Sequence, residues 1–244
     1  VYHSCRNRHC PKCQARAKEA WIAARGRELL PVPYFHLVFT LPAELRTLAR
    51  WHPTEVYTAL FRAVSELLLE LGRTHLKATL GLTMVLHTWT RDLRFHPHVH
   101  VLATAGGLAL DRERFVHVRK DFLFHVQVMG RLLRGKMLDA LRKRHRKGAF
   151  PEMNQTAFDR LMASLAAHES WVVYAKAPFH RSQHILSYLG RYTHRVGIAN
   201  SRLLDVGPEH VTFSTKHGKT ATLHPVEFLR RLVVERHRHL ANAV

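Results

Sequence analysis

Acidic residues are scarce in this sequence, and this scarcity is the most unusual feature of its composition. The 244 residues include 18 Asp and Glu against 38 Lys and Arg, a formal net charge of +20 at pH 7 with histidine neutral. The basic residues are spread over the whole chain rather than gathered in a tail. A folded protein this basic most often meets a polyanion, and nucleic acid is the first candidate. A merely basic or ribosomal-type protein is the alternative.

Long apolar runs are also missing. No stretch reaches 18 consecutive apolar residues, which excludes a transmembrane helix, and no secretory signal peptide is visible. Hydrophobic residues nevertheless make up 46% of the chain, enough for a core of ordinary size. The length allows one large domain with a small appendage.

Cysteine is rare, with three residues that all lie in the first 13 positions. This number and placement exclude a disulfide framework and favour zinc in a reducing compartment. Cys10 and Cys13 form a two-residue knuckle that places two thiolates on one ion, and Cys5 supplies a third ligand. Tetrahedral zinc needs a fourth, for which His9, His3 or a Cys pair preceding this segment are candidates. A reduced Cys cluster without metal is the alternative.

Three histidines alternate along one apolar run, residues 95–102, which reads Phe-His-Pro-His-Val-His-Val-Leu. Its Val and Leu content and the glycines at 106–107, expected to form a turn after it, predict a β-strand. Side chains two apart share a face of a strand, so His96, His98 and His100 are expected to point the same way, with Val99 and Val101 toward the core. Neighbouring imidazoles suit a divalent metal better than a core. The spacing alone is weak evidence, because a chain this rich in His contains such pairs by chance.

The remaining pattern predicts an α+β fold with a mostly antiparallel sheet and helices on its faces, since strands and helices do not alternate strictly. The expected strands are 34–40, 81–89, 115–118, 171–174 (closed by Pro178), 203–206, 211–214 and 220–223, and the expected helices are 14–30, 54–76, 124–147, 156–168, 182–192 and 226–240. Prolines at 31 and 33 end the first helix and separate a small module, 1–30, from the main domain, 31–244. Strand 81–89 carries His87 and is expected to pair with the His strand as a hairpin.

Two tyrosines, Tyr188 and Tyr192, are four apart in a predicted helix, so their rings share one face. Gly190 between them costs about 1 kcal/mol relative to Ala, which suggests that something such as a DNA backbone approaches closely there. An aromatic stripe packed on the sheet is the alternative, but Arg191 and Arg195 are unusual surroundings for a buried stripe.

A tyrosine hydroxyl is a poor nucleophile near neutral pH, and the charge of a phosphodiester repels attack. A divalent ion on the phosphate oxygens would answer the second difficulty, and a basic cleft would hold the strand. Tyrosine attack would leave a 5′-phosphotyrosine link, which stores the bond energy, and a free 3′-OH. Combined, the two motifs indicate metal-assisted DNA nicking.

Three motifs in this order closely resemble the two-tyrosine HUH transposases of rolling-circle insertion sequences (the IS-ninety-one type). They are Cys-Arg-Asn-Arg-His-Cys-Pro-Lys-Cys at 5–13, Phe-His-Pro-His-Val-His at 95–100 and Tyr-Leu-Gly-Arg-Tyr-Thr at 188–193. The likeness runs from residue 1 to about residue 223, and it implies an HUH endonuclease-like fold preceded by the end of a zinc-binding domain. It makes His98 and His100 paired metal ligands and Tyr188 and Tyr192 the nucleophiles. Relatives take a third ligand from the neighbouring strand, for which His87 is expected and His96 is the alternative.

The resemblance further implies single-strand nicking and strand transfer during rolling-circle transposition, in the cytoplasm of a bacterium and at its nucleoid. The implied partner is single-stranded DNA at the transposon ends, with Mg²⁺ or Mn²⁺ as the catalytic ion and structural Zn²⁺. The expected zinc ligands are Cys5, His9, Cys10 and Cys13, and the expected DNA contacts are Arg191, Arg195, Lys216 and Lys219. A plasmid relaxase or replication initiator, and a zinc-containing DNA-binding remnant without catalysis, are the alternatives. The oligomeric state is left open.

Overall fold

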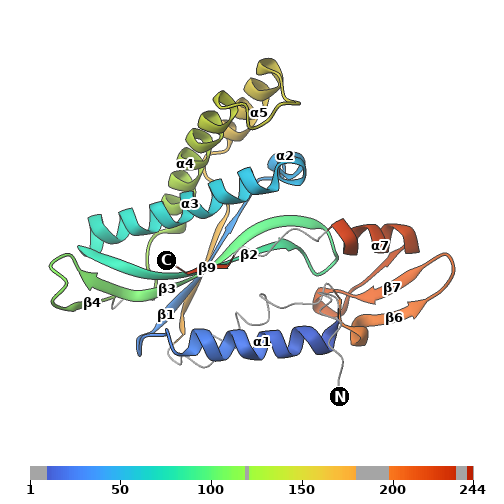
Figure 1. Cartoon of the computed structure of the whole chain (residues 1–244), viewed down its shortest axis with the longest axis horizontal. Helices are drawn as coiled ribbons and strands as arrows, with labels where there is room; N and C mark the ends of the chain where they lie inside the picture. Colours follow the sequence, from blue (N-terminus) through green and yellow to red (C-terminus); the bar gives the residue numbers. More distant parts are fainter. Residues whose placement is uncertain (1–9, 119–120, 180–197, 235–240, 244) are drawn as a thin grey trace. The chain divides into compact units, whose positions relative to one another are not determined.

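The computed structural model describes residues 10–118, 121–179, 198–234 and 241–243 (Figure 1). They form an α+β fold whose sheets are antiparallel, which confirms the predicted class. The chain folds as two compact units. The larger comprises residues 31–86, 97–182 and 240–244, and the smaller comprises 1–30, 87–96 and 183–239. In the described part of the chain, no helix has the length and apolar character needed to span a membrane.

The main sheet is built around the strand that carries the alternating histidines. Its strands lie in the order β5, β1, β3, β2, β9, and β4 pairs with the far end of β3. The bounds are β1 Tyr34–Thr40, β2 Ala78–Trp89, β3 Phe95–Ala109, β4 Phe115–His117, β5 Val173–Phe179 and β9 Ala241–Ala243. The His strand is therefore in the middle of the sheet, and residues 87–96 at the tip of the β2–β3 hairpin belong to the smaller unit.

The period of two along β1 and β3 separates an apolar face from a polar one. Leu37 of β1 lies opposite Val101 of β3, and Phe39 lies opposite Val99, all fully buried. The alternate positions place His100 opposite Val38. Helices α2 (Leu45–Trp51) and α3 (Pro53–Leu71) follow β1, and α3 runs along one side of the sheet (Figure 1). The apolar positions of α3 at helical spacing are buried, as predicted: Val56, Leu60, Val64, Leu67, Leu68 and Leu71.

A helical hairpin completes the larger unit. It consists of α4 (Val126–Arg146) and α5 (Gln155–Ala167), which project away from the sheet in Figure 1. Gly130 of α4 allows close packing, because a Cβ there would lie 2.3 Å from the carbonyl oxygen of Trp171. The side chain of Asn154 caps α5 by accepting a hydrogen bond from the backbone N–H of Ala157 at 2.9 Å.

The smaller unit has its own core around a three-stranded sheet. Its elements are α1 Pro11–Gly26, η2 Asn200–Arg202, β6 Leu203–Val206, β7 Val211–Ser214, η3 Lys216–Gly218, β8 Thr220–Leu223 and α7 Pro225–Val234. Leu93, from the hairpin tip, packs in this core with Phe213 and Phe228. The buried Arg202 guanidinium donates to the carbonyl of Ser214 at 2.7 and 2.9 Å and to that of Arg91 in the hairpin. The hairpin tip is therefore held by both apolar and polar contacts.

Several predicted boundaries are wrong, each for an identifiable reason. The strand predicted at 171–174 is β5, which continues through Pro178 because it is at the edge of the sheet, where its register with β1 also shifts. The glycines at 106–107 form no turn but continue β3, pairing with β4. The helix predicted at 54–76 ends at Leu71 and is followed by the π turn η1 (Gly72–Leu76). The helix predicted at 182–192 lies outside the described residues.

Candidate metal centre on the central strand

Three imidazoles meet on the β2–β3 hairpin. His98 and His100 lie on β3 and His87 lies on the adjacent strand β2. Each offers one ring nitrogen, and these three nitrogens all lie within 4.8 Å of one another. The three side chains are buried, with 3%, 9% and 5% of the surface of His87, His98 and His100 exposed. The structure thus brings together a donor set of the kind that binds metals.

The geometry of this group fits a divalent ion if the three ring nitrogens move slightly closer together. Three points within 4.8 Å of one another share a centre no more than about 2.8 Å from each, whereas metal–imidazole bonds are about 2.1 Å long. Rotation of the rings would close that difference. The rings of His98 and His100 already meet edge to face, with centroids 4.9 Å apart. Neutral imidazole nitrogens are ligands for transition ions, so the residues present fit a metal.

The hairpin turn that brings β2 beside β3 is closed by its own polar groups. The Thr90 N–H donates to the Arg94 carbonyl at 3.0 Å, and the Thr90 hydroxyl bonds the Asp92 carboxylate. Burial alone would raise the pKa of Asp92, but hydrogen bonds from Thr90, the backbone and Arg94 together lower it. Leu93 adopts a left-handed conformation, with φ of 58°, and its side chain is buried in the small core. The turn is therefore fixed at both its backbone and its apex.

A fourth histidine, His36, contacts His100 from β1, the strand on the other side of β3 from His87. Its Nε2 lies 2.9 Å from Nδ1 of His100, and the two rings stack with centroids 5.2 Å apart. Burial, with smaller effects of Lys176 and His98, lowers the pKa of His36 to about 4. His36 is then neutral near pH 7 and can form one hydrogen bond with His100. Because that bond occupies Nδ1, His100 would bind a metal through Nε2.

His36 was not among the site residues predicted from the sequence. A signal was present, since residues 34–40 alternate between the apolar Phe35, Leu37 and Phe39 and a second face that includes His36. What was missing was the knowledge that β1 pairs with the His strand. His96, the alternative third ligand, lies on β3, is half-buried and is not part of the group of three. The assignment of the third ligand stays a prediction.

The remaining predicted site residues fall into two sets. Those outside the described residues are Tyr188, Tyr192, Arg191, Arg195, Cys5 and His9. Of the others, Cys10 is the N-cap of α1 and Cys13 lies in its first turn, both half-buried. The start of a helix stabilises thiolates, the form that binds zinc. Lys216 and Lys219 are exposed at the turn between β7 and β8.

Comparison with known proteins places this chain in a family. The family model described as "Putative transposase" matches residues 81–239, more than half of the chain, including all three imidazoles. The chain belongs to this transposase family. A second model, described as "Transposase zinc-binding domain", matches residues 1–41 and so covers Cys10, Cys13 and His36. The predicted resemblance, with the end of a zinc-binding domain at the N-terminus, is confirmed.

Two curated relatives support the assignment. The chain is 40% identical over 249 residues to the protein named "Putative transposase y4qJ" of Sinorhizobium fredii, covering 96% of this chain and 62% of that protein. It is 32% identical over 210 residues to the "Transposase for insertion sequence element IS801" of Pseudomonas savastanoi pv. phaseolicola, covering 82% of this chain and 48% of that protein. The chain therefore spans less than two thirds of the length of either relative. No solved structure matches it.

Proposed function

We propose that this transposase nicks single-stranded DNA and transfers the cut strand through a 5′-phosphotyrosine intermediate. The observation that carries the proposal is the convergence of His87, His98 and His100 on the central hairpin, inside the segment matched by the transposase family. Buried imidazoles at this spacing, in a protein with an excess of 20 positive charges, suit a metal that meets a phosphodiester.

The three imidazoles would hold a divalent cation, whose role when bound is to polarise and orient the scissile phosphate. Nitrogen donors bind the later first-row ions more strongly, and Mg²⁺ prefers oxygen. Of the two expected ions, Mn²⁺ therefore suits this donor set better than Mg²⁺. The hydrogen bond between Nδ1–H of His100 and Nε2 of His36 would keep one ligand in a single tautomer and orientation.

The nucleophile in this proposal is the phenol of Tyr188 or Tyr192. Its oxygen forms a bond to phosphorus while the bond from phosphorus to the 3′ oxygen breaks. The phenol loses one proton and the departing 3′ oxygen gains one, so the step needs no further reactant. The ester bond is exchanged rather than hydrolysed, which leaves its energy available for rejoining. A second tyrosine one helical turn away would allow a second strand to be held in the same way.

Single-stranded DNA at element ends is the proposed partner. The two curated relatives are named as transposases, one of them for an insertion sequence element. The charge of +20 supplies attraction to phosphates, to which the exposed Lys216 and Lys219 would contribute, with Arg191 and Arg195. Structural Zn²⁺ is proposed on Cys5, His9, Cys10 and Cys13, in the segment matched by the zinc-binding model.

The test uses a suicide oligonucleotide that traps the covalent product. The full chain is incubated with Mn²⁺ and a labelled single strand carrying an element end, and protein-linked label is separated by denaturing electrophoresis. Wild type is expected to give an adduct that Tyr188→Phe with Tyr192→Phe abolishes and that His98→Ala with His100→Ala reduces strongly. His125→Ala, a change at an exposed histidine outside the group, is the matched control and should leave the yield unchanged.

Two outcomes would contradict the proposal. One is the absence of adduct with wild type under conditions where the strand is bound, which would leave a DNA-binding protein without catalysis. The other is an adduct of undiminished yield from the double Tyr→Phe variant, which would mean that another residue, or none, forms the link.

A further inference from the structure

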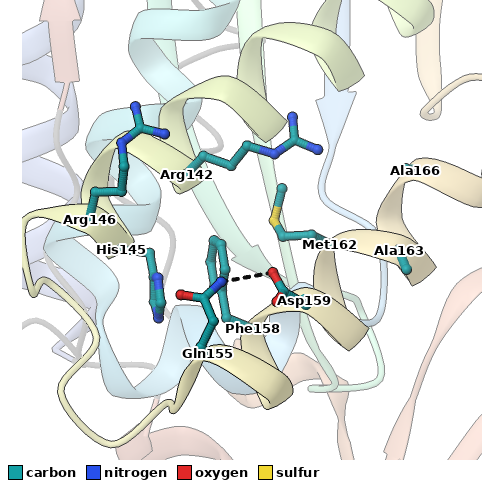
Figure 2. A pocket seen from close by; sticks show the side chains of 9 residues that line it. All are labelled: Arg142, His145, Arg146, Gln155, Phe158, Asp159, Met162, Ala163 and Ala166. Carbon is teal, nitrogen blue, oxygen red and sulfur yellow. Dashed lines mark hydrogen bonds between the residues drawn. The ribbon is translucent and has the colours of Figure 1, made fainter.

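We propose that the groove between α4 and α5 binds a stretch of single-stranded DNA, as a second contact separate from the histidine group. The groove has a volume of about 530 Å³. Figure 2 shows Arg142 and Arg146 extending from α4 on one side, and Gln155 and Asp159 on α5 on the other. The inference rests on the proposed single-stranded substrate and adds a site to it. All the lining residues belong to the larger unit.

The two arginines of the groove lack the acidic partners that their neighbours have. Along the same helix, Lys143 pairs with Asp139 at 2.7 Å, Arg144 with Glu55 at 3.1 Å, and Arg131 with Glu169. Within the described part of the chain, no ion pair involves Arg142 or Arg146, and both are exposed. Two uncompensated guanidinium groups four residues apart on one helix can each bind a phosphate of the same strand.

The carboxylate that lines the groove already accepts a hydrogen bond. Asp159 lines the groove but accepts a hydrogen bond from the side-chain amide of Gln155 at 2.9 Å. Over residues 126–168 the hairpin carries nine Lys and Arg against three Asp and Glu. One acid against two arginines in the lining leaves the groove positively charged, and the local field favours an anion.

The floor of the groove indicates that the anion is a strand with unstacked bases. It is formed by Met162, Ala163 and Ala166 of α5, and the ring of His145 lines the groove from α4. That ring is fixed, because it stacks on Phe158 with centroids 3.9 Å apart and an interplanar angle of 6°, and its Nε2 lies 3.2 Å from the Met153 carbonyl. Single-stranded binding sites combine a basic track with flat or apolar surfaces that receive bases, whereas a duplex keeps its bases stacked away. A volume of 530 Å³ is in the range of pockets that hold small ligands.

Binding of a labelled, unstructured thymidine-rich oligonucleotide by the full chain tests this inference. Fluorescence anisotropy is recorded in EDTA over a series of NaCl concentrations, so that no metal or nicking chemistry contributes. Arg142→Gln with Arg146→Gln is expected to weaken binding about tenfold and to lower the slope of log K against log salt by about 1.4, or 0.7 per phosphate contact. The matched control is Arg131→Gln with Lys143→Gln, which removes the same charge from paired residues of the same helix. It should change the slope much less.

A second pair of variants keeps the test independent of the arginines. Ala163→Glu places a carboxylate on the floor of the groove, and Ser164→Glu places one on the next residue, which does not line it. Both positions are exposed, so both variants should fold. Only Ala163→Glu is expected to weaken binding of the single strand.

The outcomes separate this inference from the proposed function. If wild type does not bind the oligonucleotide, the proposed function itself is contradicted. If wild type binds but the groove variants equal their matched controls, the groove assignment alone is wrong. Equal losses for a duplex of the same length would overturn the assignment to a single strand.

Discussion

Nε2 of His36 on β1 lies 2.9 Å from Nδ1 of His100 on β3, a hydrogen bond between buried side chains on adjacent strands. On β1, His36 also lies opposite Lys176 of β5, whose charge helps to keep its pKa low. A neutral His36 that accepts from Nδ1–H of His100 leaves the Nε2 lone pair of His100 for a cation. Outer hydrogen bonds of this kind fix the tautomer and orientation of metal-binding histidines.

The first prediction concerns this bond. His36→Phe keeps the ring but removes its nitrogens, and it should weaken Mn²⁺ binding by about 10-fold to 100-fold. His36→Gln keeps an amide that can accept from Nδ1 and should recover much of the affinity. Isothermal titration with Mn²⁺ measures both, and circular dichroism confirms that each variant is folded. If wild type binds Mn²⁺ and the Phe variant binds equally well, the positioning role of His36 is excluded.

The second prediction distinguishes the two candidates for the third ligand. His87→Ala should lower Mn²⁺ affinity by at least as much as the loss of an outer partner, about 100-fold, because it removes a direct donor. His96→Ala should change the affinity by no more than about twofold, since His96 is half-buried and outside the group of three. The reverse order, measured by the same titration, would assign the third ligand to His96.

The third prediction tests the close approach of β2 and β3. A Cβ on Gly107 would lie 2.3 Å from the carbonyl oxygen of Thr79, a backbone atom that cannot move aside without shifting β2. Gly107→Ala should therefore lower the free energy of unfolding by about 2 kcal/mol or more. Gly135→Ala is the control, because a Cβ there meets nothing within 4 Å on an exposed position of α4, and it should stabilise the protein by about 0.5–1 kcal/mol. Urea denaturation of both variants measures the difference, and similar effects of the two changes would contradict the packing described here.

The fourth prediction is a pH dependence in α7. Hydrogen bonds from Arg230 and then Arg231 lower the pKa of Glu227 to about 2, against an ordinary value of 4.5. Between those values the folded state binds fewer protons than the unfolded state, so the contribution of Glu227 to stability is complete above pH 4.5 and is lost as the pH falls toward 2. The stability difference between wild type and Glu227→Gln should thus be larger at pH 6 than at pH 3, by urea midpoints.

Glu113→Gln is the matched control for this measurement, because Glu113 is an exposed carboxylate in no ion pair of the described residues. Its difference from wild type should vary little between the two pH values. A difference for Glu227→Gln that grows on acidification would have the wrong sign for a lowered pKa.

Local patterns in the sequence predicted the parts of the fold that depend on neighbours along the chain. Strands β6, β7 and β8 begin and end where the sequence predicts, since turn residues at Gly207 and Gly218 separate them. The pairing of His87 with the His strand was also predictable, because a short hairpin joins them. Helix α2 was missed because its seven residues carry too little periodic pattern.

Features that depend on distant residues were not predictable in this way. Strand β9 has three residues and pairs with Thr83, Met84 and Val85, which are far away in the sequence. His36 joins His100 only because β1 lies beside β3, an adjacency that no local pattern encodes. The two glycines at 106–107 resemble a turn, yet they allow three strands to approach one another. The tyrosine motif lies outside the described residues, so its role stays a prediction from the sequence.

The metal centre is tested most directly by a crystal structure of the protein grown with Mn²⁺, with anomalous diffraction recorded at the manganese absorption edge. We expect one strong anomalous peak within bonding distance of ring nitrogens of His87, His98 and His100, with a phenol oxygen of Tyr188 or Tyr192 facing it. A map without a peak at these histidines, or with the ion bound elsewhere and both phenols buried in the core, would contradict the account.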